Sequence, residues 1–322
     1  MTPPSLVPLA FTCLLLAAVA AGLDLHQVET HTLVIYTTPA LRDFIEKAAI
    51  PAFTASTGIE ATPVYMTAAE EYYRIRMSED RPEADVLVHA SPLFLEKGYL
   101  SGVVEPIDLG IDLGAGNQSR PVPGGRIWQA FAWSPLVTVH RPGDTQLDLG
   151  NGTSSFGFPH PLLSNNGIYA VMFFEALDPA AGQDILDRTE IQPVNARANI
   201  GGVADGSYDL TLGYEAVARY YIDRGAEVES SIPVLDGQRA TTPVLFAASL
   251  VRNNPHPGAE QFLRALLSPE VQDQASRFHF RPILPDARQP PEALDLSGVR
   301  MLPYDWEEWD QLEADLSRYE VD

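Results

Sequence analysis

The sequence predicts an α/β protein with two successive series of strands and helices. In the first series, short β-branched apolar runs alternate with stretches whose apolar residues recur at three- and four-residue steps. Such alternation forms βαβ units, which place their strands in a parallel sheet covered by helices on both faces. The expected strands span 32–37, 59–65 and 84–89, and the expected helices span 40–57 and 68–78.

The segment 40–57 carries the clearest helical pattern. Pro39 stands where the first turn of a helix tolerates proline, and Gly58 supplies a stop. The apolar positions between them are Leu41, Phe44, Ile45, Ala48, Ala52 and Phe53. Because this spacing places the side chains on one side of a helix, the segment is predicted to cover a face of the sheet.

A second series follows a Gly- and Pro-rich stretch at 110–125, which is predicted to be a loop. Its expected strands and helices are strands 130–140, 155–158, 209–213, 228–234 and 244–251, and helices 166–177, 215–224, 257–267 and 269–278. The tail at 305–319 spaces its apolar residues as in one last amphipathic helix that docks on the body: Trp306, Trp309, Leu312 and Leu316.

The charge of the chain excludes two classes of partner. Its 322 residues include 43 Asp and Glu against 21 Lys and Arg, a formal net charge of −22. Such a surface repels phosphate backbones and anionic lipid headgroups, so we expect neither nucleic-acid binding nor polybasic membrane binding. With 45% hydrophobic and 20% charged residues, the composition is that of a folded globular protein.

The first 21 residues have the pattern of a secretory signal peptide. They carry no charged side chain, and an apolar run ends in the small residues Ala18-Val19-Ala20. An uncleaved anchor is the alternative, because no Lys or Arg precedes the run. Cys13 is the sole cysteine, so cleavage leaves a chain without disulfides or thiolate chemistry. No later stretch approaches the length of a membrane span, and we expect a soluble, exported monomer.

Several collinear segments together resemble the type II periplasmic solute-binding proteins of ABC importers, in the branch with ferric-, phosphonate-, hexose-phosphate- and molybdate-binding members. The resemblance extends from Leu33 to about Pro285. The matching segments are 33–44 (LVIYTTPALRDF), 53–59 (FTASTGI), 84–91 (ADVLVHAS), 96–100 (EKGYL), 158–167 (FPHPLLSNNG), 205–215 (DGSYDLTLGYE), 254–269 (NPHPGAEQFLRALLSP) and 281–283 (RPI).

The resemblance implies two lobes, each a mostly parallel sheet flanked by helices, joined by strands that cross near 132–140 and 242–251. The first lobe would comprise 32–131 and 245–322, and the second 132–244. It further implies a periplasmic or extracellular location, a small-molecule ligand and an ABC permease as membrane partner. No cofactor and no resident metal are expected.

Three segments join a strand to a helix and offer small polar groups to a ligand. Ligands of open α/β sheets lie beyond the carboxyl ends of the strands, where helix N-termini present backbone N–H groups. The candidate residues in these segments are Thr37, Thr38, Thr67, Ser164, Asn165 and Asn166. Each threonine has an alternative role as a helix cap. The resemblance implies ligand contact by the segment containing Ser164.

Three further candidates follow predicted strands: His89, Tyr214 and Glu215. Tyr214 can donate a phenolic hydrogen bond to an anion or, ionised, bind a hard metal. A packing tyrosine and a structural histidine are the alternatives for Tyr214 and His89. Arg42 and Arg197 could also neutralise an anion, although surface or structural ion pairs are the more common role of arginine.

The segments favour a small oxyanion-bearing solute as ligand, such as a phosphonate, an organophosphate or a metal oxyanion. Ferric iron is the alternative, because ferric-binding relatives use a Tyr-Tyr pair, and pairs occur at Tyr72-Tyr73 and Tyr220-Tyr221. The second pair falls inside a predicted helix, however, and not at its entrance. A ligand-sensing ectodomain is the other alternative. No enzyme is expected, since P-loop, Rossmann, zincin and nucleophile-elbow motifs are all missing from the sequence.

Overall fold

The computed structural model describes residues 32–78, 81–111, 119–143, 149, 154–189, 191–253, 256–302 and 309–319. The chain divides into Met1–His31 and Thr32–Asp322, and the second unit is the one described below. The predicted signal peptide at 1–21 and the residues Trp306, Trp309 and Leu312 lie outside the described side chains. None of the described helices is long and apolar enough to cross a membrane.

A first group of parallel strands opens the described chain. β1 (Leu33–Thr37) lies between β2 (Ala61–Tyr65) and β3 (Val86–His89) and is parallel to both. The helices of this group are η1 (Pro39–Leu41), α2 (Arg42–Phe44), η2 (Ile45–Ala49), α3 (Ile50–Thr57), α4 (Ala68–Met77) and α5 (Leu93–Leu100). The three predicted strands and both predicted helices are confirmed, and α5 was not predicted.

The predicted helix at 40–57 changes its geometry along its length. The five residues Ile45–Ala49 form a π-helical turn, and α3 follows with Pro51 in its first turn. Pro51 has no N–H to donate to the previous turn, and its ring crowds that turn's carbonyl, which the wider π turn accommodates. The helix ends at Gly58, whose φ of 73° is readily adopted only by glycine.

A second group of elements holds the middle of the chain. β7 (Phe156–Gly157) is parallel to β8 (Leu210–Tyr214), and β9 (Glu229–Ser231) lies nearby. The helices of this group are α6 (Asn165–Leu177), α7 (Pro179–Leu186), α8 (Ala196–Asp205) and α9 (Glu215–Ile222). The predictions of α6 and α9 are confirmed, whereas α7 and α8 were not predicted.

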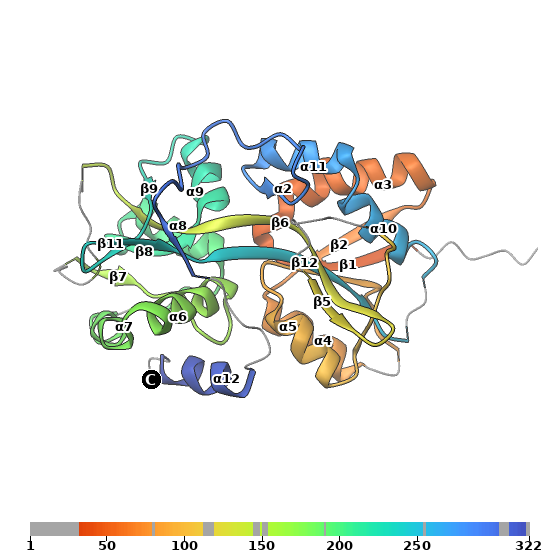
Figure 1. The fold of residues 1–322 in the computed structure, drawn as a ribbon, viewed down its shortest axis with the longest axis horizontal. Coiled ribbons are helices and arrows are strands. Elements are labelled where there is room, and N and C mark those ends of the chain that lie inside the picture. Colours follow the sequence, from red (N-terminus) through yellow and green to blue (C-terminus); the bar gives the residue numbers. More distant parts are fainter. Residues whose placement is uncertain are drawn as a thin grey trace, which may run out of the picture. The chain divides into compact units, whose positions relative to one another are not determined.

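Two long strands connect the groups. β6 (Gly125–His140) and β12 (Pro243–Val251) run across the centre of Figure 1, antiparallel to each other. Residues 129–135 of β6 pair with β12, and residues 136–140 pair with β8. The hydrogen-bonded order is β2-β1-β3-β12-β6-β8-β7, so the two parallel groups are not isolated sheets. β6 belongs to both.

The prediction of a loop over 110–125 is wrong for residues 119–122, which form a strand. β5 (Ser119–Val122) pairs with the start of β6 in a tight hairpin. Pro123 and Gly124 form the turn, and Gly124 has a φ of 92°. Proline followed by glycine at positive φ is a common turn pair, so the Gly/Pro signal marked a hairpin turn here.

The C-terminal part returns first to one group and then to the other. It contains α10 (Ala259–Leu266), α11 (Pro269–Ala275), η5 (Ser276–Phe278), β13 (Arg281–Pro282), β14 (Arg300–Met301) and α12 (Trp309–Arg318). β14 joins two strands that precede β12, β10 (Val234–Leu235) and β11 (Gln238–Thr241), in a small sheet. β13 pairs with β6, whereas β14 pairs with β11. The tail helix α12 lies against α6, where Tyr319 stacks on Phe158 at 5.5 Å.

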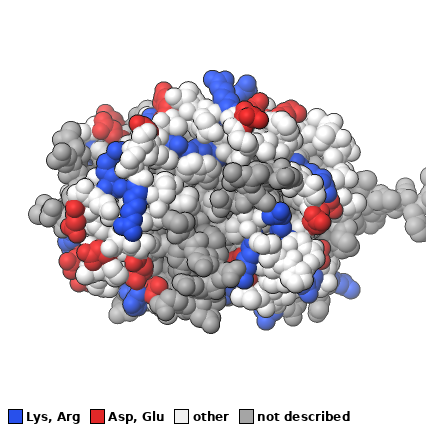
Figure 2. Space-filling model, viewed as in Figure 1, with Lys and Arg blue, Asp and Glu red and all other residues white. Residues whose placement is uncertain are grey.

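Charged side chains of both signs are scattered over the face drawn in Figure 2, despite the large negative net charge. Arginines are frequently beside carboxylates; Arg141 with Asp209 and Arg74 with Glu83 are examples. Exposed pairs of this kind contribute little to stability, about 0–1 kcal/mol each. On this face, the distribution of charge therefore does not mark a ligand site.

Candidate ligand-binding site

The carboxyl ends of β1, β2, β3 and β8 lead to one cavity. Each of these strands is followed within a few residues by a residue of the cavity wall: Thr38, Thr67, Ala90 and Tyr214. This is the edge at which open α/β sheets bind ligands, because the helices that follow the strands begin there. Four predicted strands thus converge on the site.

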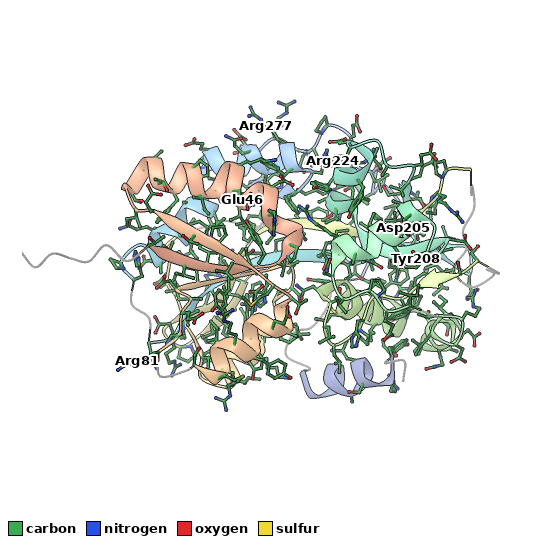
Figure 3. All side chains as sticks on the ribbon, turned by 180° about the vertical axis from the view of Figure 1, so that it is seen from behind. Glu46, Arg81, Asp205, Tyr208, Arg224 and Arg277 are labelled. Atoms are coloured by element: carbon green, nitrogen blue, oxygen red, sulfur yellow. The ribbon has the colours of Figure 1, made fainter. Side chains whose placement is uncertain are left out.

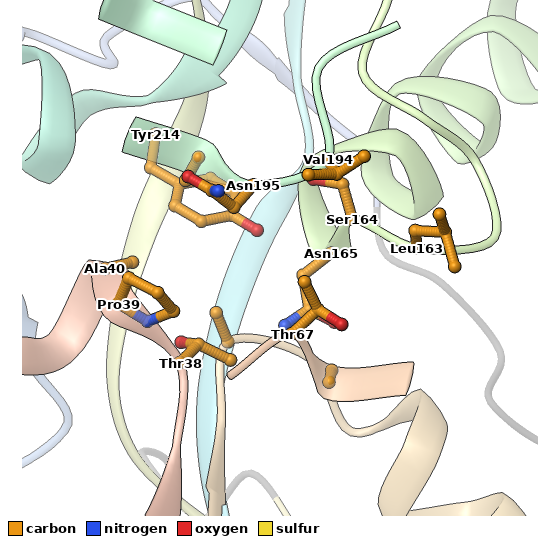
Figure 4. Close-up of a pocket in the computed structure, with 13 residues that line it drawn as sticks. Thr38, Pro39, Ala40, Thr67, Leu163, Ser164, Asn165, Val194, Asn195 and Tyr214 are labelled. Carbon is orange, nitrogen blue, oxygen red and sulfur yellow. The ribbon is translucent and has the colours of Figure 1, made fainter. Parts of the chain in front are cut away.

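The cavity, counted together with the solvent space at its open side, has a volume of about 270 Å³. Figure 4 shows side chains of the two groups facing each other across it, with Thr38 and Thr67 on one side and Ser164, Asn195 and Tyr214 on the other. The full lining is Thr38, Pro39, Ala40, Thr67, Ala68, Ala90, Leu163, Ser164, Asn165, Val194, Asn195, Ala196 and Tyr214. No residue of this lining carries a charge.

Five of the lining residues are helix N-caps. Thr38 precedes η1, Thr67 precedes α4, Ser164 precedes α6, Asn195 precedes α8 and Tyr214 precedes α9. The first backbone N–H groups of a helix have no partner within the helix, and the N-terminus carries about half a positive charge. Five N-caps around one uncharged cavity therefore create a positive potential without any cationic side chain.

Two of these caps use their side chains locally. The Thr67 hydroxyl accepts a hydrogen bond from the Glu70 N–H, and the Glu70 carboxylate accepts one from the Thr67 N–H at 2.7 Å. The Asn195 amide oxygen accepts from the Ala198 N–H at 2.9 Å. Both side chains fulfil the ordinary role of an N-cap, and Thr67 thus follows the alternative role considered for it.

The other three caps leave their hydroxyl groups without a partner. Thr38 is 5%, Ser164 2% and Tyr214 0% exposed, yet the hydroxyl oxygen of each has no hydrogen-bond partner. Buried hydroxyls are nearly always paired, because an unpaired one costs about 1–3 kcal/mol. These three hydroxyls in one cavity wall are available to hydrogen-bond a ligand.

Tyr214 is held in place by other aromatic rings. Its ring packs edge-on against Tyr169 and Phe246, with centroids 6.4 and 5.8 Å away, and its hydroxyl points into the cavity in Figure 4. Burial, followed by the nearby Tyr169, raises the pKa of Tyr214 well above its usual value. The phenol is therefore protonated in the empty site and can donate a hydrogen bond.

Three more predicted residues lie at or next to the wall. Asn165 lines the cavity, and its amide oxygen has no partner. Thr37 and Asn166 are fully buried with unpaired polar atoms, but neither lines the cavity. The structure therefore brings together five of the nine predicted residues, namely Thr38, Thr67, Ser164, Asn165 and Tyr214.

The structure does not place His89 in the cavity. Its Nε2 lies 2.6 Å from the Glu71 carboxylate, and both side chains are fully buried. Burial raises the pKa of Glu71, while the neighbouring His89 opposes the increase. His89 thus joins the end of β3 to α4 beneath the wall, as in the structural alternative considered for it.

Glu215 is likewise absent from the cavity. Its carboxylate accepts hydrogen bonds from the Arg281 guanidinium at 3.0 and 3.2 Å and from the Leu294 N–H. A buried carboxylate with a paired arginine is a structural group, because separating the pair would leave a charge without solvation. Glu215, although a candidate binding residue, therefore does not line the cavity.

The tyrosine pairs are not part of the cavity either. The Tyr220 hydroxyl accepts from Arg197, and the Tyr221 hydroxyl donates to the Arg197 carbonyl. Tyr73 is exposed on α4. Within the described residues, no group of three or more His, Cys, Asp and Glu side chains could hold a metal ion.

Sequence reasoning missed Asn195 and the small residues around it. Asn195 precedes a segment with two consecutive glycines, Gly201 and Gly202, which weakened the helical pattern of α8. The signal that could have found it is the sequence Pro193-Val194-Asn195, since asparagine is a favoured N-cap.

The comparisons with known proteins identify the family of the chain and its fold. Residues 33–281 match a family model described as bacterial extracellular solute-binding protein. The chain belongs to this family. No curated protein matches the sequence. The resemblance to type II periplasmic solute-binding proteins is therefore confirmed for most of the chain.

Solved structures share the fold of this solute-binding protein. The periplasmic binding protein AfuA from Actinobacillus pleuropneumoniae, with fructose-6-phosphate bound, superimposes with a TM-score of 0.76 at 16% identity, covering 89% of this chain and 97% of that chain. A periplasmic thiamin binding protein gives 0.73 at 18%, covering 90% and 95%. Iron-bound HitA from Pseudomonas aeruginosa gives 0.72 at 17%, covering 90% and 99%. The predicted two-lobe α/β fold is confirmed.

Proposed function

We propose that this solute-binding protein carries a small oxyanion-bearing solute, such as a phosphonate, an organophosphate or a metal oxyanion, to an ABC importer. The observation that carries the proposal is the uncharged cavity lined by five helix N-caps, three of which leave a buried hydroxyl unpaired. Backbone N–H groups, hydroxyls and helix dipoles suit an anion. A cationic ligand would find no carboxylate in the lining.

The alternative ligand, ferric iron, fits the lining less well. Ferric iron is a hard cation that takes ionised oxygen ligands. The cavity offers one phenol, Tyr214, whose pKa is raised by burial, and no carboxylate or histidine. The five helix N-termini would also repel a cation.

Two lobes would close over the solute by bending at the crossing strands. We propose 32–131 and 245–322 as the first lobe and 132–244 as the second. The described C-terminal residues also contact the second lobe, because Glu292 and Leu294 bind Arg219 and Glu215, and α12 lies against α6. The cavity lies between the lobes, since Thr38 and Ser164 come from different ones.

The protein would act outside the cytoplasm as a monomer without enzymatic activity. Residues 1–21 would direct export and be removed, and the folded part would then meet the permease at the outer face of the membrane. The family described as extracellular solute-binding supports this location. A sensor role for the same binding event differs only in the membrane partner.

Isothermal titration calorimetry with a panel of solutes tests the ligand class. The panel comprises inorganic phosphate, methylphosphonate, a sugar phosphate, molybdate, ferric citrate, thiamine and a polyamine, each added to protein freed of bound solute by partial unfolding and refolding. At least one anion is expected to bind in the micromolar range or tighter. Binding of ferric iron, thiamine or a polyamine with no response to any anion would refute the oxyanion proposal.

A further inference from the structure

A second, larger depression lies beside the cavity. We call it the seam groove; its volume, counted together with the solvent space at its open side, is about 580 Å³. Its lining comes from three parts of the chain: the first helical segment after β1, the helices α8 and α9, and the segment around η5. The lining residues are Ala40, Asp43, Phe44, Lys47, Arg197, Ala216, Val217, Tyr220, Asp223, Arg224, Arg277, Phe278, His279 and Phe280. The groove therefore follows the boundary between the two assigned lobes.

The seam groove is positive on a strongly negative protein. Asp43 is surrounded by three cations: Lys47 at 2.5 Å, Arg197 at 3.2 Å and Arg224 at 3.8 Å. One carboxylate against three cations leaves two positive charges. Arg277 adds one more positive charge and Asp223, which lies 2.8 Å from the His279 ring, adds one negative charge, so the lining carries a net charge of +2 with His279 neutral. Figure 3 shows Arg224 and Arg277 at the same edge of the molecule.

The guanidinium groups of the groove are fixed in position. Arg197 and Arg224 both lie over the ring of Tyr220, with the guanidinium carbons 4.2 and 3.5 Å from its centre. Arg197 also donates to the Tyr220 hydroxyl at 2.8 Å. Because the ring already restricts both guanidinium groups, each arginine loses less conformational entropy when it binds an anion. The cluster is therefore organised before any ligand arrives.

The groove and the cavity adjoin at the first helical segment after β1 and at the starts of α8 and α9. Ala40 lines both spaces. Ala196 lines the cavity, and the next residue, Arg197, lines the groove. Tyr214, the N-cap of α9, lines the cavity, while Ala216 in the first turn of α9 lines the groove. A ligand bound at the N-caps thus has the basic cluster as its neighbour.

We propose that the solute carries two anionic groups, the first held at the uncharged N-caps of the cavity and the second by Arg197, Arg224 and Lys47 in the seam groove. This inference rests on the proposed oxyanion function. It narrows the ligand class to compounds such as phosphonocarboxylates and bisphosphorylated metabolites. Because the two anionic groups would engage both lobes, such a ligand also favours the closed form.

Asp43, the acidic residue among these cations, should weaken the binding of a second anionic group. Burial alone would raise the pKa of Asp43, but hydrogen bonds from Lys47 and Arg197 outweigh it, and the pKa lies below its usual value. Asp43 is therefore ionised and competes with the second anionic group for the same cations. Its removal should strengthen binding of a doubly anionic ligand, whereas removal of an arginine should weaken it.

Calorimetry with matched ligands tests the inference. Methylphosphonate supplies one anionic group, and phosphonoacetate and phosphonopropionate supply two. The better of the two phosphonocarboxylates is expected to bind wild-type protein at least about tenfold more tightly than methylphosphonate, the size of one charge-assisted hydrogen bond. Arg224→Gln should remove most of this difference, and Asp43→Asn should increase it. Arg300→Gln, which lies outside the groove, is the control and should leave it unchanged.

The outcomes separate this inference from the proposed function. If methylphosphonate or phosphate binds and the added carboxylate does not increase the affinity, the second anionic site is refuted. The proposed oxyanion function would be unaffected by that result. If the higher affinity for the phosphonocarboxylate persists in both Arg224→Gln and Arg197→Gln, the second anionic site is also refuted, because the carboxylate would then bind elsewhere. If no anion binds in either series while the protein is folded by circular dichroism, both proposals are wrong.

Discussion

At the scale of single residues, the site is distinguished by helix N-caps whose side chains form no capping hydrogen bond. Thr67 and Asn195 hydrogen-bond to the first turns of their helices, as serine, threonine and asparagine caps ordinarily do. Thr38, Ser164 and Tyr214 occupy equivalent positions without such bonds. These three hydroxyls are therefore not used by the protein itself and can donate hydrogen bonds to a bound anion.

Changing Ser164 to aspartate should abolish anion binding without unfolding the protein. Aspartate is a favoured N-cap, so α6 should remain stable. A carboxylate about 4 Å from a bound anion costs about 4 kcal/mol at an effective dielectric constant of about 20. The dissociation constant measured by calorimetry should therefore rise about a thousandfold.

Ser164→Asn is the matched control, because asparagine has the size of aspartate without its charge. It should bind the anion more weakly than wild type by a smaller factor than Ser164→Asp. Equal loss in the two variants would mean that steric crowding, and not charge, governs the site. Melting temperatures close to that of wild type would show that neither variant disturbs the fold.

The residues that sequence reasoning misplaced have partners far away along the chain. Glu215 pairs with Arg281, 66 residues later, and His89 pairs with Glu71 on the preceding helix. A single sequence shows that Glu215 and His89 follow strands, but it does not show which way a side chain points or what it meets. By contrast, the positions of Thr38, Ser164 and Tyr214 at helix starts were predictable, because the change from an extended segment to a helix is a local pattern.

At the scale of elements, the start of α6 depends on a close approach between two backbone segments. A Cβ atom on Gly167 would lie 2.2 Å from the His160 carbonyl oxygen and 2.6 Å from that of Pro159. The loop 158–164 therefore packs directly on the first turn of α6. This contact holds Ser164 and Asn165 at the cavity wall.

Gly167→Ala should destabilise the protein and weaken ligand binding together. Real Cβ contacts with backbone do not occur at such distances, so the loop must move, and overpacking of this kind costs about 1–3 kcal/mol. Urea denaturation measures the loss of stability, and calorimetry measures the loss of affinity.

Gly201→Ala provides the comparison within a helix. The nearest atom to its Cβ would be the Tyr221 hydroxyl oxygen, at 3.4 Å, which is ordinary van der Waals contact. Alanine is favoured over glycine in a helix by about 1 kcal/mol, so this variant should be unchanged or more stable. Destabilisation by both variants to the same extent would contradict a special role for the close approach at Gly167.

Elements were predictable where their pattern was local and long. The strands β1, β2 and β3 and the helix at 40–57 were found because apolar spacing was regular over each segment. α7 and α8 were missed, since both are short and contain glycine in the helix interior. β5 was missed because a hairpin is defined by pairing with β6, and the Gly/Pro turn alone does not specify its partners.

At the scale of the whole described unit, β6 and β12 are the connection on which any lobe motion depends. Pro135 of β6 stands opposite Pro243 of β12 in the strand register. The next pair is held by a hydrogen bond from the Leu136 N–H to the Thr242 carbonyl oxygen at 3.0 Å and by one from the Thr241 hydroxyl to the Leu136 carbonyl oxygen. The two strands thus cross together at one place, and we infer that bending occurs there.

Ligand binding should bring the lobes together about this crossing. The cavity wall contains Thr38 from the first lobe and Ser164 and Tyr214 from the second, so an anion forms its full set of hydrogen bonds only when both lobes reach it. A ligand shifts such an equilibrium by its difference in affinity for the two states. Small-angle X-ray scattering should therefore show a smaller radius of gyration when a binding anion is added at saturation.

Ser164→Asp protein at the same anion concentration should keep the radius of gyration of the protein without anion. Identical scattering of wild-type protein with and without bound anion, at saturation verified by calorimetry, would mean that the lobes are already closed and that the crossing strands do not act as a hinge.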